Sequence, residues 1–210
     1  MTTTGTAARV YVVDDDEMFR KSLHWLLESV GLQVAAFATA AEFLDAYRAG
    51  DPGCLVLDIR MPGMSGLQLQ DELAARAVRL PIVFLTAHGD VPMAVAAVKK
   101  GAVDFVQKPY NDQRLLDVIQ GALQRDADTR AADERHRRTA ALIAAMTPRE
   151  REVMNAVVAG KTNKIIADEL GVAVKTIEAH RARMMDKMGA SSVAELVRLV
   201  TAIDAGPSSG

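Results

Sequence analysis

The stretch VVDDDE, residues 12–17, places three carboxylates directly after a short apolar run. Crowded carboxylates repel one another, so each one becomes harder to ionise. These residues alone leave two explanations open. The stretch can be a solvated, charged turn, or it can hold a small, hard cation such as Mg²⁺, which prefers oxygen ligands. The choice between them depends on the fold in which the carboxylates are set.

The composition is that of an ordinary globular protein. Of the 210 residues, half are apolar and a quarter are charged, and the formal net charge is −2. This length suits one or two domains that each bury a core. Residues 1–125 carry 15 acidic and 12 basic side chains, whereas residues 147–210 carry 8 and 9, which is a weak contrast. A single cysteine excludes a disulfide framework, and its apolar neighbours favour a core position for Cys54.

No segment suggests a membrane span or an export signal. No apolar run approaches the roughly 18 residues that span a bilayer. The first residues, MTTTGTAA, lack the basic end and the apolar core of a signal peptide. We therefore expect a cytoplasmic protein with no membrane partner.

The first part of the chain alternates between two patterns. Short, β-branched runs are followed by segments in which apolar residues recur at helical spacing, as Phe19, Leu23 and Leu27 do. Five strands that alternate with five helices predict an α/β fold, a doubly wound five-stranded parallel sheet, over residues 8–125. The five runs are RVYVV, LQVAAF, CLVL, PIVFL and DFVQ.

The rest of the chain has no strand pattern. Residues 126–141 are rich in alanine and alternating charge, which favours a solvated helical linker, with a disordered tether as the alternative. Residues 142–205 predict an all-α domain of four short helices, whose first helix opens with the capping signal TPRE at residues 147–150. Residues 206–210 predict a flexible tail.

Polar side chains follow four of the predicted strands at the point where each strand ends. They are Asp14 and Asp15, then Asp58, Thr86 and Lys108. Ligands of open parallel sheets bind beyond the carboxyl ends of the strands, so we expect these groups to share one site. One carboxylate there can attack a phosphoryl donor, and the others can hold Mg²⁺. An ammonium and a hydroxyl can contact the phosphoryl oxygens, so the position of these groups favours the cation explanation of VVDDDE.

The stretches VVDDDE, LVLDIRMPGMSG, VFLTAHGD and DFVQKPY resemble the four signature stretches of response-regulator receiver domains, which have a flavodoxin-like fold. The resemblance covers about residues 8–125. It implies that Asp58 accepts a phosphoryl group and that Mg²⁺, for which Mn²⁺ could substitute, is the cofactor. It further implies that Asp15, Asp58 and the backbone carbonyl of Arg60 ligate the metal directly and that Asp14 does so through water. Thr86 and Lys108 would contact the phosphoryl group, and Thr86 and Phe105 would be the switch residues. The Lys108–Pro109 bond would be cis.

Residues 160–189, GKTNKIIADELGVAVKTIEAHRARMMDKMG, predict a helix-turn-helix. The triplet GKT at residues 160–162 is not a phosphate-binding loop, because that motif needs a glycine where this chain has Asn155. One short helix ends at Gly171, and a second begins near Val174.

The second of these helices has one apolar face and one polar face. Ile177, Met184 and Met188 fall on the apolar face. The opposite face combines small residues such as Ala179 with long basic ones such as Arg183, which lets a helix approach base edges in the major groove. The pattern alone leaves an amphipathic helix with a solvated charged face as an equal alternative.

Residues 142–205 are similar to the LuxR/NarL-type four-helix DNA-binding domain, and with TAHGDVPMAV the chain most resembles the FixJ branch of response regulators. Ala173 in place of the usual serine or threonine cap, and Ile165 in place of a polar residue, depart from the pattern. The resemblance implies that Thr176, Glu178, Ala179, Ala182 and Arg183 face bases and that Lys161, Asn163, Lys164, Lys175, His180, Arg181 and Lys187 contact phosphates.

Together the two resemblances imply a phosphorylation-activated transcriptional regulator of a two-component system, which is not an enzyme. The expected partners are a sensor histidine kinase, double-stranded promoter DNA, a second copy of the chain when phosphorylated, and RNA polymerase as a further candidate. Two rival functions are a phosphorylation-independent DNA-binding regulator and an aspartyl-phosphate hydrolase. The hydrolase needs a second aspartate two residues after the nucleophile, where this chain has Arg60. The intact set of polar residues at the strand ends argues against the phosphorylation-independent regulator.

Overall fold

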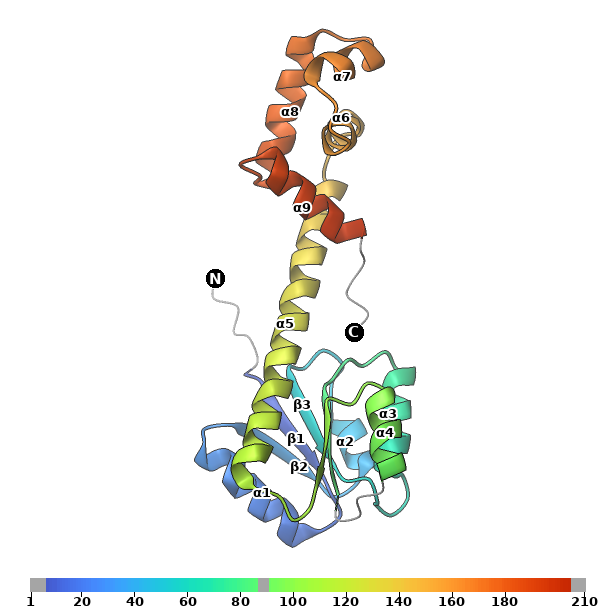
Figure 1. Cartoon of the computed structure of the whole chain (residues 1–210), viewed down its shortest axis with the longest axis vertical. Coiled ribbons are helices and arrows are strands. Elements are labelled where there is room, and N and C mark those ends of the chain that lie inside the picture. The colour runs from blue at the N-terminus through green and yellow to red at the C-terminus, as the bar shows by residue number, and fades with distance from the viewer. Residues whose placement is uncertain (1–6, 87–90, 205–210) are drawn as a thin grey trace. The chain divides into compact units, whose positions relative to one another are not determined.

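The computed structural model describes residues 7–86 and 91–204 (Figure 1). The chain divides into two compact units, Met1–Asp128 and Thr129–Gly210, and the helix α5 contains the boundary between them. Each unit has its own hydrophobic core.

The first unit is a five-stranded parallel sheet with helices on both faces, as the sequence predicts. The strand order is β2-β1-β3-β4-β5, so the direction of winding reverses between β1 and β3. Such a reversal opens a crevice at the carboxyl ends of the strands. The elements are β1 (Arg9–Val13), α1 (Glu17–Ser29), β2 (Gln33–Phe37), α2 (Ala40–Ala46), β3 (Gly53–Leu57), α3 (Gly66–Ala75), β4 (Ile82–Thr86), α4 (Val91–Lys99), β5 (Asp104–Gln107) and α5 (Asp112–Ala144).

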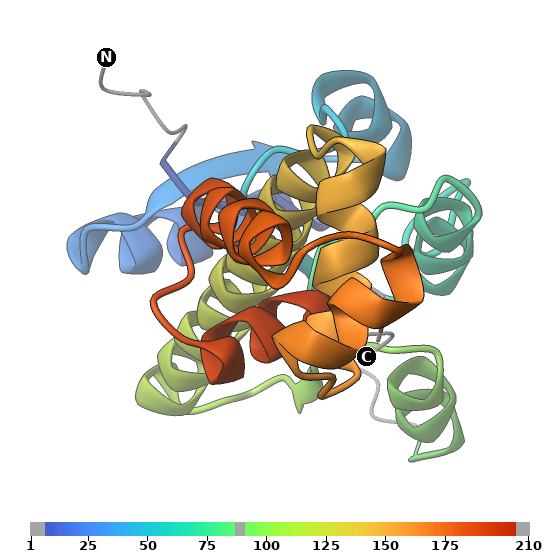
Figure 2. The ribbon, with the colours of Figure 1, turned by 90° about the horizontal axis from the view of Figure 1, so that it is seen from above.

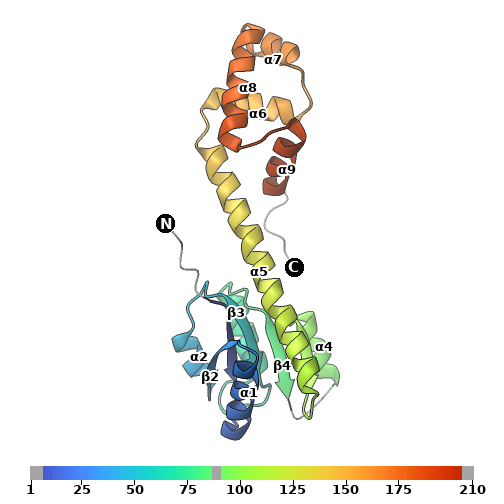
Figure 3. The ribbon, with the colours of Figure 1, turned by 90° about the vertical axis from the view of Figure 1, so that its left-hand side faces the viewer.

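Successive side chains of a strand point to opposite faces of the sheet, so the core of this unit has two layers. In β1, Val10 and Val12 pack with α1 and α5, whereas Tyr11 and Val13 pack on the other face with α2 and α3. Figure 3 shows α1 and α5 in front of the sheet. Cys54 is fully buried in the layer beneath α1 and α5, and burial raises the pKa of its thiol to about 12, so it is a core residue as expected. Both faces of the sheet are covered, which leaves its carboxyl-terminal edge for a site.

The segment that the sequence predicts as a linker, residues 126–141, lies within α5. The expectation of a solvated helix does not hold at its first residue, because Asp126 is only 4% exposed. Its Oδ2 accepts a hydrogen bond from the Gly53 N–H at 2.9 Å. Gly53 has a φ of 153°, and a Cβ there would collide with the carbonyl oxygen of Arg9. The start of β3 therefore lies so close to β1 that only glycine fits, and its N–H binds α5.

The second unit consists of helices around a core of their own. Glu150 and Thr147 form the predicted capping box, and Gly171 ends the first helix of the helix-turn-helix in a left-handed conformation. Ala173 provides no side-chain cap for the next helix, and Ile165 is 46% exposed. The turn between these two helices is visible in Figure 2. The helices are α6 (Pro148–Val158), α7 (Asn163–Leu170), α8 (Val174–Met188) and α9 (Val193–Asp204).

Within the described residues, no helix combines the length and the apolar character that crossing a bilayer requires. The predicted tail, residues 206–210, lies outside the described residues.

Candidate functional site

The ends of β1 and β3 bring two aspartates together. Val13 and Leu57 are partners in the register of these strands, so Asp14 and Asp58 follow them side by side. The Asp58 N–H donates to the Val13 carbonyl at 2.9 Å, which extends the ladder by one residue. Both side chains are buried: Asp14 is 3% exposed and Asp58 is 8% exposed. Two carboxylates therefore lie at one point of the sheet edge with little water to solvate them.

Lys108, the first residue after β5, supplies a positive charge to both carboxylates. Its Nζ lies 2.6 Å from Oδ2 of Asp14 and 3.8 Å from Oδ1 of Asp58. The ammonium also lies 3.4 Å from the centroid of the Phe19 ring, which adds a cation–π attraction. The Lys108–Pro109 bond is cis, as the resemblance implies. The nearest partner of Lys108 is thus Asp14.

The loop after Asp58 is held close to it. The Arg60 N–H donates to Oδ2 of Asp58 at 3.0 Å. The loop returns so tightly that a Cβ on Gly66 would collide with the Asp58 carbonyl oxygen. Burial raises the pKa of the Asp58 carboxyl above its ordinary value of 3.8. The Lys108 ammonium lowers this pKa, and the Asp14 carboxylate raises it.

The three aspartates of VVDDDE have three different environments. Asp14 is buried against Lys108, and its Oδ1 accepts the Asp16 N–H at 2.9 Å. Asp16 is the N-cap of α1, where its Oδ1 accepts the N–H groups of Met18 and Phe19. Asp15 is exposed and lines a shallow pocket of about 570 Å³ together with Arg60 and Met61. Repulsion within the run is thereby reduced, because each side chain has a different neighbour.

The donor atoms at this edge have the chemistry that a hard divalent cation requires. Asp14, Asp15 and Asp58 offer carboxylate oxygens, and Asp15 raises the pKa of Asp58 through its charge. Across residues 7–86 and 91–204, however, no three His, Cys, Asp or Glu side chains are gathered as a ready-made metal cluster. The residues fit Mg²⁺ by donor type and by excess negative charge.

Two further residues predicted for this site lie on β4 and β5. Thr86 ends β4 and pairs with Gln107, and its side chain lies outside the described part of the chain. Phe105 pairs with Phe84 and packs, half-buried, against the core layer beneath α2 and α3. Their backbones therefore lie on neighbouring strands that end at the same edge.

The sequence prediction missed two residues of the site, Phe19 and Arg20. Phe19 lies under Lys108, and the Arg20 guanidinium donates to the Asp14 carbonyl at 2.6 Å. Both belong to the first turn of α1, which begins directly after Asp16. The cap residue Asp16 is the sequence signal that places this turn beside the carboxylates.

The second unit presents a polar face on α8. Ile177, Met184 and Met188 are buried in the core, as predicted. The residues that the resemblance assigns to bases, and one phosphate candidate, are all exposed on this helix. They are Lys175, Thr176, Glu178, Ala179, Ala182 and Arg183.

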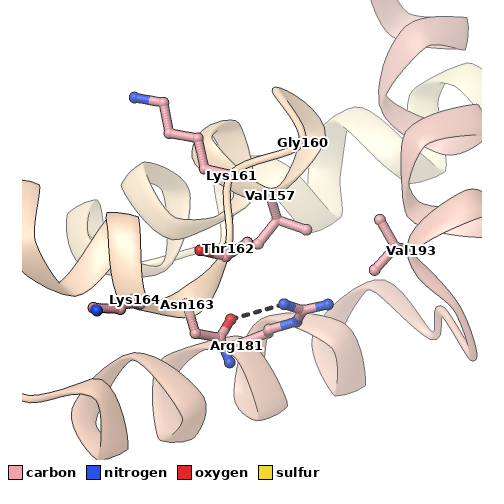
Figure 4. A pocket seen from close by; sticks show the side chains of 8 residues that line it. All are labelled: Val157, Gly160, Lys161, Thr162, Asn163, Lys164, Arg181 and Val193. Carbon is pink, nitrogen blue, oxygen red and sulfur yellow. Dashed lines mark hydrogen bonds between the residues drawn. The ribbon is translucent and has the colours of Figure 1, made fainter.

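A pocket of about 530 Å³ lies beside α8 at the start of α7 (Figure 4). The Arg181 guanidinium donates to Oδ1 of Asn163 at 2.8 Å, as the dashed line shows. Lys161 lines the same pocket, but its Nζ lies 2.6 Å from a carboxylate oxygen of Glu169. Lys164 is exposed at the second position of α7. Of these four phosphate candidates, Lys161 already has an acidic partner.

Two other phosphate candidates on α8 are less available than the sequence suggests. Lys187 contacts Glu150, with Nζ 2.7 Å from Oε2. His180 is half-buried, and its Nδ1 has no hydrogen-bond partner among the described residues. The structure therefore divides the predicted DNA contacts into an exposed set and a set that is half-buried or has partners inside the protein.

Comparison with known proteins finds two families along the chain. Residues 10–120 match the response regulator receiver domain, and residues 144–200 match the bacterial regulatory proteins of the luxR family. The chain is 46% identical to the transcriptional regulatory protein TdiR of Thauera aromatica, with 95% of this chain and 88% of that protein covered. It is 45% identical to FixJ of Bradyrhizobium diazoefficiens, with 95% and 96% covered.

Solved structures agree with this assignment. The chain is similar to the response regulator StyR with a TM-score of 0.84 and 46% identity, over 92% of this chain and 98% of that one. It is similar to full-length FixJ from B. japonicum with a TM-score of 0.59 and 43% identity, over 95% and 98%. A receiver domain implies a histidine kinase as partner, and a luxR-family domain implies binding to DNA. The chain therefore belongs to the response regulators of the FixJ/NarL type, which are two-component transcriptional regulators that join a receiver domain to a LuxR-type helix-turn-helix domain.

Proposed function

We propose that Asp58 accepts a phosphoryl group from the phosphohistidine of a sensor kinase and that this event switches DNA binding. The observation that carries the proposal is the buried arrangement of Asp58, Asp14 and Lys108 at the carboxyl edge of the sheet. An Asp58 carboxylate oxygen attacks phosphorus, the P–N bond breaks, and the imidazole leaves with the bonding electrons. Burial around Asp58 limits access of bulk water to the product.

Mg²⁺ belongs to the same proposal, with Mn²⁺ as a substitute. Asp15, Asp58 and the backbone carbonyl of Arg60 would hold it, and Asp14 would contribute through water. When bound, the ion neutralises negative charge on the transferring group. The excess of carboxylates over ammonium groups at this edge, and the raised pKa of Asp58, support the assignment.

The new charge on Asp58 would act on residues of neighbouring strands. Lys108 lies 3.8 Å from Asp58 and can move its hydrogen bond from Asp14 to a phosphoryl oxygen. Thr86, at the end of β4, would contact the same group, and Phe105 would change its rotamer. Such a change would shift the conformational equilibrium of the face formed by α4 and β5. The shifted conformation would favour assembly of the phosphorylated chain.

The output would be paired DNA-binding domains. The phosphorylated chain would form a homodimer and place two α8 helices on promoter DNA in the cytoplasm, with RNA polymerase as a further candidate partner. Thr176, Glu178, Ala179, Ala182 and Arg183 would face bases. Phosphate contacts would come from Lys164 and Lys175, which are exposed, from His180 and Arg181 on α8 itself, and from Lys161 and Asn163 at the start of α7.

Labelling with acetyl phosphate and Mg²⁺ tests the proposal against its rivals. We expect stable, stoichiometric labelling of the full chain, no labelling of Asp58→Asn, and normal labelling of Asp45→Asn, an exposed control on α2. Rapid multiple turnover would indicate a hydrolase. Absence of any label, together with unchanged DNA binding, would indicate a phosphorylation-independent regulator.

A further inference from the structure

Glu150 is a buried carboxylate in the second unit. It is 3% exposed, and it lies in the first turn of α6. Its Oε2 accepts the Thr147 N–H at 2.9 Å, while Oγ1 of Thr147 accepts the Glu150 N–H at 3.2 Å. The capping box therefore fixes the position of this carboxylate. A buried carboxylate also requires a charged partner, because burial without one is costly.

Lys187, near the end of α8, provides that partner. Its Nζ lies 2.7 Å from the same Oε2 of Glu150, and its side chain is 39% exposed. The hydrogen bond from Lys187 and the one from the Thr147 N–H lower the pKa of Glu150 to about 2. The Glu150 carboxylate therefore stays charged over the whole physiological range of pH.

The ion pair adds a directional contact between two helices that otherwise meet through apolar side chains. Val153 and Val157 of α6 share a core with Met184 of α8. Apolar contacts are non-directional and leave some freedom for a helix to rotate about its axis. A hydrogen-bonded ion pair has a defined geometry, and Lys187 follows Arg183 by four residues, which is about one helical turn. Fixing Lys187 therefore also fixes the rotation of α8, and with it the side of the domain on which Arg183 lies.

We propose that Lys187 is a positioning residue that orients the recognition helix through Glu150 and does not contact DNA. This inference rests on the proposed DNA-binding function of α8. It replaces the phosphate contact that the family resemblance implies for Lys187. If Nζ of Lys187 left Glu150 to reach a phosphate, the Glu150 carboxylate would remain buried without a charged partner. The free-energy cost of that burial opposes such a contact.

Salt-dependent DNA binding by the full chain separates the two roles. A phosphate contact contributes about 1 to the slope of log K against log salt concentration, whereas a positioning residue contributes nothing to it. We expect Lys187→Met to weaken binding to a specific site by at least about fivefold, the lower limit for one lost base contact, at an unchanged slope. Random DNA should bind as before. The matched control is Lys175→Met, an exposed lysine of the same helix, which should lower the slope and weaken both DNAs.

Glu150→Gln is an independent test, because its result does not depend on whether the Lys187→Met variant folds. It frees Lys187 while leaving its charge in place. Positioning predicts weaker specific binding, and a phosphate contact predicts equal or tighter binding. The effects of the two substitutions should also be less than additive in the double variant, and Lys187→Arg should restore part of the specificity.

Three results would overturn the inference: a slope that falls by about 1 in Lys187→Met, tighter binding by Glu150→Gln, or additive effects in the double variant. A wild-type chain that shows no preference for any site over random DNA would instead count against the proposed function. In that case, additive effects of the two substitutions on thermal unfolding would still overturn the coupling between Glu150 and Lys187.

Discussion

Lys108 and Asp14 form a largely buried ion pair, with Nζ 2.6 Å from Oδ2, although they are 94 residues apart in the chain. The Asp14 side chain is 4% exposed and that of Lys108 is 17% exposed. The pair closes the carboxyl edge of the sheet by joining the end of β1 to the end of β5. Lys108 therefore has a structural role before any phosphoryl group arrives.

We expect Lys108→Met to destabilise the metal-free protein by about 3 kcal/mol, because it leaves the Asp14 carboxylate buried and unpaired. Mg²⁺ should recover part of this loss, since a cation at the same edge replaces the missing charge. Thermal unfolding with and without Mg²⁺ measures both effects, and Lys21→Met on the exposed part of α1 is the control. The variant should still accept phosphate yet fail to dimerise. Normal dimerisation of the labelled variant would remove Lys108 from signal transmission.

Asp58→Asn should stabilise the metal-free protein at neutral pH. The pKa of Asp58 is raised in the folded state, chiefly by burial, so the folded protein binds more protons than the unfolded chain does above pH 3.8. Stability is then lost as the pH rises through that range, and the amide avoids this loss. We expect a higher unfolding temperature for the variant at neutral pH, equal values below pH 3.8, and a smaller gain from Mg²⁺. A less stable variant at neutral pH would show that Asp58 is not electrostatically strained.

Glu150 should give the opposite pH dependence. Its pKa is lowered from 4.5 to about 2, first by the hydrogen bond from Lys187 and then by the Thr147 N–H. The stabilisation is present above pH 4.5 and is lost as the pH falls through about 2. The difference in unfolding temperature between wild type and Glu150→Gln should therefore be constant above pH 4.5 and shrink below it. Glu152→Gln, an exposed neighbour, should show little difference at any pH.

Much of the fold could be predicted because each element carries a local signal. Alternating runs and helical spacing gave the five strands and the helices, and the ends of the strands located Asp58 and Lys108 at one edge. Periodicity identifies the face on which a residue lies, but it does not identify the residue's partner. The partners of Lys108, Asp126 and Lys187 come from distant parts of the chain, so they became visible only once the elements were packed.

Arg183→Ala should lower specific DNA binding by about 1–3 kcal/mol, the range for one bidentate contact with a guanine edge. Arg183 is exposed on α8 beside the small residues Ala179 and Ala182, which leave room for a base pair to approach. Binding to random DNA should change little. Competition titrations with cognate and scrambled sites measure the preference, and an unchanged ratio would exclude Arg183 from base recognition.

The affinity of one DNA-binding domain for one half-site should be low. Residues 147–210 carry nine basic and eight acidic side chains, and three of the basic ones, Arg149, Lys161 and Lys187, have acidic partners within the domain. Few charges remain to release counterions from the duplex. A single recognition helix also contacts only a few base pairs, which limits the specific part of the binding energy.

Phosphorylation should therefore act mainly by joining two domains. Dimerisation makes the second contact intramolecular, which can raise overall affinity by about 10²–10⁴-fold without any new contact. The half-sites should lie about one helical turn, 10–10.5 bp, or a multiple of it apart. We expect phosphorylation to tighten binding to such a paired site strongly and to leave binding to a single half-site nearly unchanged. Titration of both DNAs with phosphorylated and unphosphorylated chain measures this. Equal tightening on the single half-site would mean that phosphorylation relieves masking of α8, with dimerisation as a secondary effect.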